Sequence, residues 1–468
     1  MNVILINTPT KLQRFRNPLM FGQEPLNVAY LASVLINNNH KVIIKDFNVE
    51  GYNKNKLIKL CKKFCCDIVG ISCTTPTFST TNKIIKDLRK ELNPTIILGG
   101  KHPSSMPQKT MEESQADFVV CGEGEEILPE LIDAIQKNKS YSGIPGITYK
   151  EAGRIIVNPP QKPTDDLDSI PFPARDLLYS NRYRSFSTGK KFSNILSSRG
   201  CPFSCTYCYN SKNNPAFKRI RFRSIDNIVQ EIKLLNDKYG INEFQFVDDN
   251  FTINPKRVIQ FCNVIEQNNL KIKFIVQGRV NSADLEMYKK LKEAGCELIA
   301  FGIESGDDGI LQDIKKQITV AQIEKAVKIA KESGINVRGN FIIGFPNDTP
   351  ETITKTIKLA KKLKLFRASF FMLTPYPHSS LWEEIVERGI INTEKVNWNK
   401  FDQQHYYFTN KNLTEKALNH YLDFGRVYSS TKLKQTIGDF LSSNNKKNFL
   451  KNWIAVKFGY YEALKPSK

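Results

Sequence analysis

The chain has 468 residues, which at roughly 100–200 residues per domain is enough for two to four domains. Hydrophobic residues make up 40% and charged residues 25% of it, and this ordinary globular usage excludes a disordered, collagen-like or coiled-coil chain. Lys and Arg number 68 against 47 Asp and Glu, a net charge of +21 that admits nucleic acid, an anionic membrane surface or an acidic substrate as a partner.

The lysines are spread along the chain and do not gather in one tract. A composition biased toward Lys and Asn therefore also explains the charge, and we expect no nucleic-acid partner. There is no run of about eighteen apolar residues that would predict a transmembrane helix. The N-terminus, MNVILINTP, has neither a basic segment nor a small-residue cleavage site, so it predicts a buried first strand and a cytoplasmic protein. Ten cysteines without an export signal favour metal binding over disulfides.

Residues 1–140 alternate apolar runs with helical patterns, and the runs lie at 3–7, 41–47, 67–72, 95–100 and 117–125. Runs rich in Val and Ile that are separated by helices predict a doubly wound parallel sheet, an α/β Rossmann-like domain. Such sheets bind ligands at the carboxyl ends of their strands. Small or polar residues at these ends would let the backbone approach a large ligand, and they are Thr8, Ser72, Thr74, Gly99, Gly100, Gly122 and Glu123.

Residues 141–190 are typical of a linker between domains. They contain GIPGITY, an Ala-Gly-Arg hairpin turn at 152–154 and IIVN. The stretch PPQKPTDDLDSIPFPA at 159–174 follows, and prolines at this density favour an extended, semi-rigid crossing.

The alternation of strands and helices resumes in residues 191–385. Strands are predicted at 194–198, 243–247, 273–277, 297–303, 336–343 and 368–373, and helices at 225–238, 255–268, 282–294, 320–333 and 352–364. Six βα units cannot close an eight-stranded barrel, so they predict a partial, open (β/α)6 barrel whose functional residues follow the strand carboxyl ends. Residues 386–468 have an aromatic, helical pattern and predict a small α-helical C-terminal region.

Three cysteines, Cys201, Cys205 and Cys208, follow the first strand of this barrel with the spacing Cys-x3-Cys-x2-Cys. Three thiolates on one tight loop would leave one iron of a 4Fe-4S cluster without a protein ligand, and a small molecule with an amine and a carboxylate can chelate that iron. A structural zinc site needs a fourth ligand, but the next cysteine is Cys262 and the next downstream histidine is His378. The spacing therefore favours an iron–sulfur site over zinc.

This cysteine motif resembles the signature of the radical S-adenosylmethionine (SAM) enzymes. Three later stretches resemble strand-end motifs of that family, namely VDDNFTIN at 247–254, AFGIESGDDGILQDIKK at 300–316 and GNFIIGFPNDTPE at 339–351. The N-terminal part, with EPLNVAYLASVL, LGGKHPSSMP and FVVCGEGEEILPEL, is similar to the cobalamin-binding domain fused to many such enzymes. The resemblance covers about residues 1–385 and is closest to the branch of the bacteriochlorophyll ring cyclase and the phosphonate methylases.

The resemblance implies that the three cysteines bind the cluster and take part in catalysis. It also implies contacts with SAM or substrate for seven further residues, which are Tyr207, Asp248, Asp249, Gln277, Arg279, Glu304 and Ser305. By resemblance, Tyr207 would contact the adenine, Glu304 and Ser305 the ribose and methionine portion, and Asp248 and Asp249 the SAM amino group or the substrate. Structural alternatives remain, because an aspartate can cap a turn, an arginine can be solvated and a glutamate can form an ion pair.

The cobalamin resemblance lacks one element. Many cobalamin domains carry Asp-x-His-x-x-Gly after the first strand, which supplies a histidine to cobalt, whereas this chain has Asn7-Thr8-Pro9 there. Either the cobalt has no histidine ligand or the domain has lost cobalamin. His40 and His102 lack the required surroundings, although His102 could contact the corrin or bond to backbone. The string Cys61-Lys-Lys-Phe-Cys65-Cys66 predicts packing at a helix end.

Three functions stay open at this point. The first is a radical methyltransferase that uses a 4Fe-4S cluster, SAM and cobalamin, with a one-electron donor such as flavodoxin or ferredoxin. The second is radical ring closure, oxidation or rearrangement of a hydrophobic substrate without methyl transfer, and the third is a binding protein without catalysis. Basic and aromatic residues interleave between 432 and 461. They would either contact an anionic membrane, which suits a lipid-like substrate, or pack over the barrel.

Overall fold

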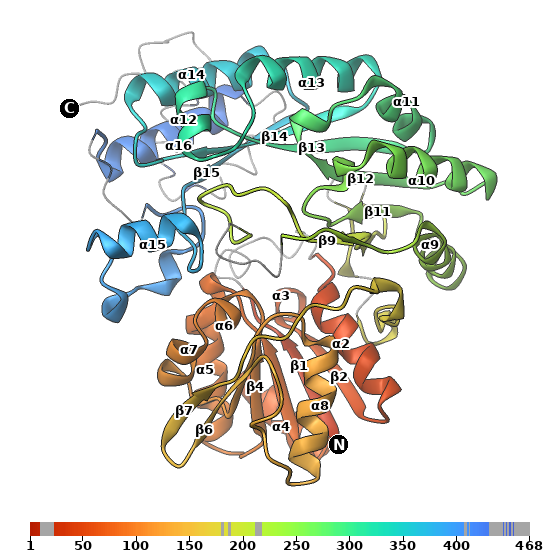
Figure 1. Ribbon diagram of the computed structural model, residues 1–468, viewed down its shortest axis with the longest axis vertical. Helices are drawn as coiled ribbons and strands as arrows, with labels where there is room; N and C mark the ends of the chain where they lie inside the picture. Colours follow the sequence, from red (N-terminus) through yellow and green to blue (C-terminus); the bar gives the residue numbers. More distant parts are fainter. Residues whose placement is uncertain are drawn as a thin grey trace. The chain divides into compact units, whose positions relative to one another are not determined.

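The computed structural model describes residues 1–9, 23–178, 182–185, 189–210, 218–406, 410 and 412–429, with the single positions 443, 446, 449, 450 and 453. The chain forms two compact units (Figure 1). The first unit comprises Met1–Asn194 and Asn397–Asn399, and the second comprises Ile195–Val396 and Lys400–Lys468.

The first unit is built on a seven-stranded sheet in the order β2-β1-β3-β4-β5-β6-β7. Its strands are β1 (Asn2–Asn7), β2 (Lys41–Asp46), β3 (Ile68–Ser72), β4 (Thr95–Gly99), β5 (Phe118–Val120), β6 (Ile147–Glu151) and β7 (Arg154–Val157). The pairs among β1 to β5 are parallel, which confirms the predicted doubly wound sheet. The chain leaves β1 toward β2 on one side and later returns to β3 on the other, and ligands bind at such a reversal of strand order.

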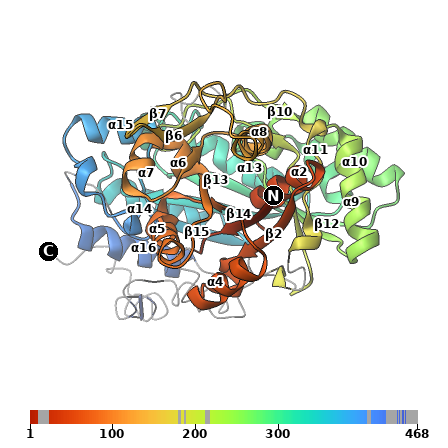
Figure 2. The same cartoon turned by 90° about the horizontal axis from the view of Figure 1, so that it is seen from below.

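Helices cover both faces of this sheet, as the all-apolar strands require. The helices are α2 (Leu26–Asn37), α3 (Phe47–Glu50), α4 (Lys54–Lys63), α5 (Phe78–Arg89), α6 (Lys101–Ser105), α7 (Pro107–Glu113) and α8 (Gly124–Gln136). Figure 2 shows α2 and α8 on one side and α4 and α5 on the other. Two apolar clusters fill the two sides, one including Val3, Leu5 and Ala29, the other Ile4 and Ile6.

Residues 141–190, expected to be a linker, differ from that expectation in their first part. Strand β6 pairs antiparallel with β5 and β7 pairs antiparallel with β6, so the two strands extend the sheet of the first unit. The physical reason is burial, because Ile147 and Tyr149 are 0% and 2% exposed within the apolar core. The turn between the strands uses Ala152 and Gly153, both with positive φ.

The second unit contains a six-stranded sheet in the order β15-β14-β13-β12-β11-β8. Its strands are β8 (Ser193–Ile195), β11 (Glu243–Phe246), β12 (Lys273–Gly278), β13 (Cys296–Glu304), β14 (Asn336–Ile343) and β15 (Arg367–Met372). The pairs from β11 to β15 are parallel. A short antiparallel ribbon, β9 (Ser198–Arg199) with β10 (Arg221–Phe222), follows the first strand.

The helices of the second unit alternate with these strands, as predicted. They are α9 (Ile225–Tyr239), α10 (Pro255–Gln267), α11 (Leu285–Glu293), α12 (Asp308–Asp313), α13 (Val320–Glu332), α14 (Pro350–Lys362), α15 (Ser380–Glu387) and α16 (Glu415–Ser429). Figure 1 shows α10, α11, α13 and α14 on one side of the sheet. Local signals set the helix ends, since the Ser224 side chain caps α9 and Gly240 ends it in the left-handed conformation.

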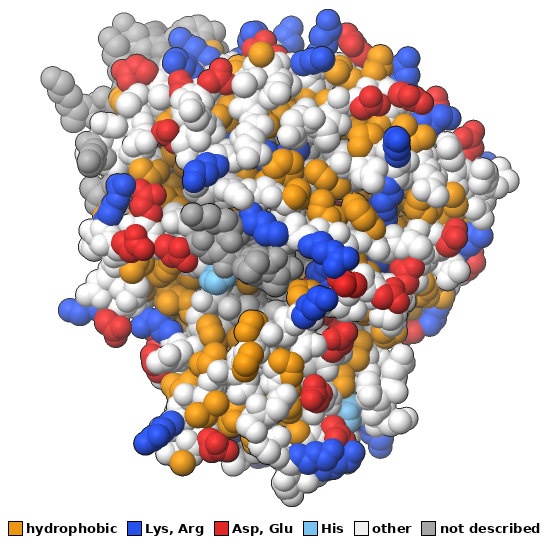
Figure 3. Space-filling model, viewed as in Figure 1, with side chains coloured by type: hydrophobic (Ala, Val, Ile, Leu, Met, Phe, Trp, Pro, Cys, Tyr) orange, Lys and Arg blue, Asp and Glu red, His pale blue; other side chains and the backbone are white. Residues whose placement is uncertain are grey.

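Within the described residues, no helix combines the length and the apolar character that crossing a bilayer requires. Most of the basic, aromatic stretch at 432–461 lies outside the described residues. On the face shown in Figure 3, Lys and Arg side chains are interleaved with Asp and Glu.

Candidate functional site

The three-cysteine loop directly follows the β9 strand. Cys205 is buried, and Cys201 and Cys208 are partly exposed. All three are free thiols, and the amide of Cys208 donates to the carbonyl of Cys205 at 3.1 Å. The loop thus folds back on itself and carries three sulfur donors within eight residues.

Backbone hydrogen bonds hold this loop in place. The Thr206 amide donates to the Ile314 carbonyl at 3.0 Å, and the Thr206 carbonyl accepts from the Leu381 amide at 2.9 Å. The Lys218 ammonium donates to the Phe203 carbonyl at 2.7 Å. Segments that are distant in the sequence therefore fix the loop before any cofactor binds.

The donor set of the loop fits an iron–sulfur cluster better than a single ion. Among the described residues, no group of three or more His, Cys, Asp or Glu side chains is arranged to hold one metal ion. A zinc ion needs thiolates at about 2.3 Å, whereas a cubane keeps its three thiolates farther apart. Burial raises the pKa of the Cys201 thiol, so binding of iron would release its proton.

Arg279 lies against the cysteine loop and does not point to solvent. Its guanidinium carbon is 3.6 Å from the centre of the Phe203 ring, and Nη1 donates to Cys205 Sγ at 3.6 Å. Nη2 donates to the carbonyl of Lys316. A cation beside sulfur favours the thiolate form. The guanidinium therefore supports the sulfur, although by resemblance we expected it in the ligand cavity.

A buried network joins the cysteine loop to the end of β13. Lys316 Nζ donates to Glu304 Oε1 at 2.7 Å and to the Tyr207 hydroxyl at 3.1 Å. The side chains of Lys316 and Glu304 are only 7% and 8% exposed. Glu304 has φ +65° beside an irregularity in the β13–β14 register, which turns its carboxylate inward. Burial is the main cause that raises the pKa of Tyr207 well above its usual range, and the negative charge of Glu304 is the second cause.

The sequence prediction did not include Lys316. Lys316 is the last residue of the 300–316 stretch that resembles the family, so the sequence could have pointed to it. Its pairing with Glu304, however, depends on how α12 folds back.

A second residue that the sequence prediction omitted is Asp348, which accepts from the amides of Gly344 and Phe345, both at 2.9 Å. Burial raises the pKa of Asp348 to about 6. The carboxyl shapes the loop after β14.

The two adjacent aspartates after β11 take different environments. Asp248 is 0% exposed and accepts from the Ser197 amide at 3.0 Å and from the Ser198 hydroxyl at 2.6 Å. Burial raises its pKa. Asp249 is exposed and accepts from the Asn210 amide group at 2.8 Å. Asp248 therefore holds the chain that leads into the cysteine loop, and Asp249 is the one available to a ligand.

Gln277 and Ser305 lie at the carboxyl ends of neighbouring strands. Gln277 is half-buried, and its side chain has no hydrogen bond to any described residue. The Ser305 hydroxyl is buried 3.2 Å from the hydroxyl of Thr356, which also accepts from the Gly306 amide at 2.9 Å. All hydrogen-bonding groups of the Gln277 side chain are thus left for a ligand. The Ser305 hydroxyl is already close to Thr356 of α14.

The predicted ligand edge of the first unit is assembled by β1, β3, β4 and β5, which are neighbours in the sheet. The Thr8 hydroxyl donates to the Ser72 carbonyl at 2.8 Å, and the Ser72 hydroxyl accepts from Asn27 at 2.6 Å. Thr74 and Thr77 bond reciprocally at the start of the turn after β3. These contacts tie the ends of β1 and β3 together.

Two glycines shape the same edge, Gly100 by close packing and Gly122 by leaving space. Gly100, after Gly99, has φ +107°, and a Cβ there would lie 2.5 Å from the Cys73 carbonyl oxygen. Only glycine fits such a position. Gly122 has φ +90° with nothing within 4 Å of a Cβ position, and Glu123 next to it is half-buried. The backbone is therefore accessible to a large ligand beside β5.

His102 is not placed as a metal ligand. It is 1% exposed, with its ring 4.3 Å from Phe78 and 4.8 Å from Trp398, and its Nδ1 is 3.3 Å from the Thr75 hydroxyl. Trp398 reaches the first unit from the C-terminal part of the chain and donates to Glu113 at 3.1 Å. Burial lowers the pKa of His102 to about 3. The histidine is a neutral core residue.

The other sequence features considered for metal binding are structural here. His40 lies 3.3 Å from the Met1 amino group, at the amino end of the sheet and away from the ligand edge. Cys61 is buried in α4, and Cys66 Sγ donates to the Ile68 carbonyl at 3.1 Å. Both cysteines pack at the end of a helix.

We expect acid to destabilise the first unit through His102. The pKa is about 3 when folded and about 6.5 when unfolded, so below pH 6.5 the unfolded chain binds the extra proton and stability falls. Between pH 7 and pH 5 this residue should cost about 2 kcal/mol of unfolding free energy. Urea unfolding followed by tryptophan fluorescence should show a shallower pH dependence for His102→Phe. An unchanged slope would contradict the neutral, buried state.

Two family models match the chain. A B12 binding domain matches residues 21–132, and the radical SAM superfamily matches residues 195–360. The protein named uncharacterized methyltransferase PH0819, from Pyrococcus horikoshii, is 37% identical over 433 residues, which cover 91% of this chain and 92% of that protein. The chain belongs to the radical SAM superfamily, in the group with a B12-binding domain.

Other similar proteins agree with this membership. The anaerobic magnesium-protoporphyrin IX monomethyl ester cyclase of Rubrivivax gelatinosus is 29% identical over 80% of this chain and 68% of its own. The solved structure of the cobalamin-dependent SAM radical enzyme OxsB, with aqua-cobalamin and SAM bound, has a TM-score of 0.78. It is 20% identical and covers 99% of this chain and 71% of its own, so it shows the shared fold.

This radical SAM protein is therefore an enzyme, and its cofactors are a 4Fe-4S cluster, SAM and cobalamin. The three-cysteine loop lies in the radical SAM domain, and the glycine-lined edge after β4 and β5 lies in the B12-binding domain.

Proposed function

We propose that this enzyme methylates an unactivated carbon of a small or lipid-like molecule. When bound, the cluster and SAM would supply a 5′-deoxyadenosyl radical that removes hydrogen, and cobalamin would supply the methyl group. The observation that carries the proposal is the presence in one chain of a prearranged three-thiol loop and an open B12 edge. The likeness to a relative named as a methyltransferase supports it.

Residues of the second unit would bind the cluster and the polar part of SAM. Cys201, Cys205 and Cys208 would hold the cluster, with Arg279 stabilising the charge on Cys205. The polar part of SAM carries an ammonium and a carboxylate. In the Glu304–Lys316 pair, the Glu304 carboxylate would bind the ammonium and the Lys316 ammonium would bind the carboxylate.

The remaining groups near the loop would place the ring and the polar end of SAM. Tyr207 and Phe345, with ring centres 5.8 Å apart, form an aromatic wall that suits the adenine. Asp249 and Gln277 keep hydrogen-bonding capacity for the substrate or the SAM amino group. A radical this reactive requires exclusion of water, and the buried character of Arg279, Glu304 and Lys316 meets that need.

In the first unit, the Gly99-Gly100 turn and the Gly122-Glu123 segment would accommodate cobalamin. His102 would leave the cobalt without a histidine, because it is enclosed by Phe78 and Trp398. A one-electron donor such as flavodoxin or ferredoxin, and peripheral membrane contact by the C-terminal region, belong to this proposal as partners.

The test is anaerobic incubation with SAM, hydroxocobalamin and a strong reductant. We expect 5′-deoxyadenosine and S-adenosylhomocysteine together, because the first reports hydrogen removal and the second reports methylation of the cofactor. A fully loaded enzyme that forms neither compound would refute the proposal.

The alternative to methylation is radical cyclisation, oxidation or rearrangement, and it is less favoured, although one relative is named as a cyclase. In that case the substrate would lose hydrogen or gain oxygen without methyl transfer. Product mass separates the two, since methylation adds one CH2. Formation of 5′-deoxyadenosine without S-adenosylhomocysteine would favour the alternative.

A further inference from the structure

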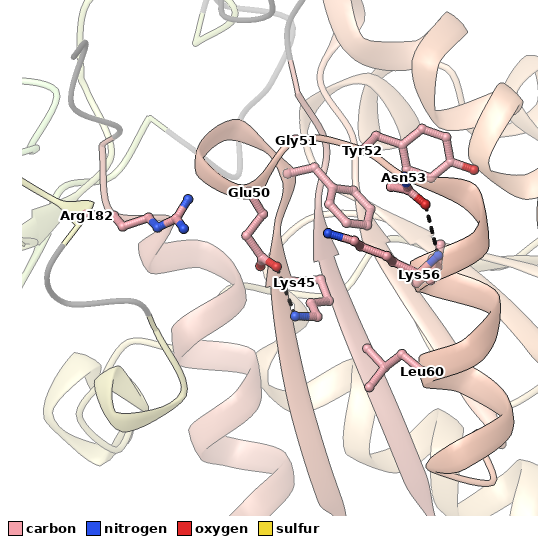
Figure 4. A pocket seen from close by; sticks show the side chains of 10 residues that line it. Lys45, Glu50, Gly51, Tyr52, Asn53, Lys56, Leu60 and Arg182 are labelled. Carbon is pink, nitrogen blue, oxygen red and sulfur yellow. Dashed lines mark hydrogen bonds and ion pairs between the residues drawn. The ribbon is translucent and has the colours of Figure 1, made fainter. Parts of the chain in front are cut away.

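A cavity of about 600 Å³ lies at the outer side of the first unit, beyond the edge strand β2. Its volume is within the range of small-molecule sites. It is lined by the end of β2, by α3, by the start of α4 and by Arg182 (Figure 4). The residues implied in cobalamin binding follow β1, β3, β4 and β5, so none of them lines this cavity.

One wall of the cavity is apolar and aromatic. Phe47 and Tyr52 pack edge to face with ring centres 5.3 Å apart, and Leu57 and Leu60 continue the wall along α4. Gly51 lines it with φ +72° and has nothing within 4 Å of a Cβ position, which leaves room between the rings and solvent. This wall suits the flat face of a ring.

The rest of the cavity lining carries charged side chains. Three basic and one acidic side chain line the cavity, namely Lys45, Lys56, Arg182 and Glu50. Lys45 is neutralised by Glu50 at 2.9 Å. Figure 4 shows Lys56 and Arg182 extending toward this ion pair from opposite sides. The Lys56 ammonium has no hydrogen bond or ion pair with any described residue, so one cation is left for a ligand.

The buried acid at the end of β2 does not neutralise these cations. Asp46 ends β2, and its carboxylate accepts from the side chains of Asn7 and Tyr183 at 2.8 and 2.9 Å and from the Asn48 amide at 3.1 Å. Asp46 is 1% exposed and is absent from the cavity wall. Asp87, which accepts from the Tyr52 hydroxyl at 2.8 Å, is also absent from the lining. The side chains that line the cavity therefore carry three positive charges against one negative charge.

We propose that this cavity binds a phosphate ester that carries a ring. Lys56 is the cation left for the ligand, and the Arg182 guanidinium, which also donates to the Val49 carbonyl at 2.8 Å, adds a second positive charge on the opposite side. Two positive charges match a group with several anionic oxygens better than a single carboxylate, and Arg and Lys both bind phosphate. The ring would lie on the Phe47–Tyr52 wall. Such an ester has two possible sources, the nucleotide tail of bound cobalamin or a free phosphate ester. The site lies outside the groups assigned to the reaction and does not depend on methyl transfer.

The probe is 1-naphthyl phosphate, titrated by fluorescence against the full-length protein without SAM. We expect saturable binding, and we expect Lys56→Glu to weaken it at least about tenfold, or about 1.4 kcal/mol. The substitution should not unfold the protein, because Lys56 is exposed and an acid in the first turn of a helix is favourable.

The matched control is Lys59→Glu, which makes the same charge change at an exposed position of α4 outside the cavity. It should leave the affinity for 1-naphthyl phosphate within about twofold, and neutral 1-naphthol should bind both variants equally. The proposal is overturned if Lys59→Glu weakens binding as much as Lys56→Glu, or if millimolar 1-naphthyl phosphate shows no saturable binding.

A second pair of probes identifies the source. Hydroxocobalamin carries the nucleotide tail, and cobinamide lacks it. If Lys56→Glu weakens hydroxocobalamin binding but not cobinamide binding, the site holds the cofactor tail. If it weakens only 1-naphthyl phosphate, the site serves a free phosphate ester. Binding is measured without turnover, so a failure of the proposed methylation would not affect this result.

Discussion

Replacement of Cys201, Cys205 and Cys208 together by alanine should remove all SAM cleavage. The three side chains are the only thiols on the loop, and the next cysteine along the chain, Cys262, is buried in α10, so it cannot substitute. Iron and sulfide content and the visible absorption of the anaerobically prepared protein should fall to background. The fold should persist, because the loop is anchored by its backbone.

The control for this experiment is Cys65→Ala. Cys65 is exposed in the first unit and has φ +47°, so its replacement changes a thiol without touching the loop. We expect wild-type iron content and wild-type formation of 5′-deoxyadenosine. Retention of iron and activity in the triple variant would refute the assignment of the cluster.

Hydrophobic periodicity was sufficient to predict the alternating strands and helices of both sheets. The strand Asn336–Ile343 matches its predicted range, and the other barrel strands differ by one to three residues. A strand that is buried on both faces appears in the sequence as a continuous apolar run, and the ends of a helix are marked by capping residues. The first part of the expected linker was less predictable. Its hairpin turn is visible in the sequence, but the pairing of β6 with β5, which adds the hairpin to the first sheet, depends on tertiary packing.

The sequence places the candidate site residues at strand ends, as the structure does, but it does not predict how their side chains are oriented. The cysteine loop was found from its spacing alone. The inward turn of Asp248 depends on hydroxyls of Ser197 and Ser198, fifty residues earlier in the chain. The contact of Trp398 with His102 joins residues almost three hundred positions apart. Such pairings are set by tertiary packing, which no local pattern encodes.

Lys316→Met should strongly destabilise the second unit. It leaves the Glu304 carboxylate buried without its cation, and breaking a buried ion pair by removing one partner costs about 3–5 kcal/mol. Glu304→Gln should cost a similar amount for the converse reason. The double variant should recover most of this loss, because it buries no uncompensated charge, so the two effects should be far from additive. Urea unfolding of the wild type, the two single variants and the double variant gives the four free energies of this double-mutant cycle.

The exposed pair Lys328–Glu332 on α13 provides the control, since its side chains are 75% and 54% exposed. The corresponding cycle there should be additive, because exposed pairs contribute little. SAM affinity then separates the two roles of the buried pair. If Glu304 and Lys316 contact SAM, the double variant regains stability and still fails to bind SAM. A double variant that regains both would show that the pair is structural, and the polar part of SAM would then have to be held by Ser305, Asp249 or Gln277.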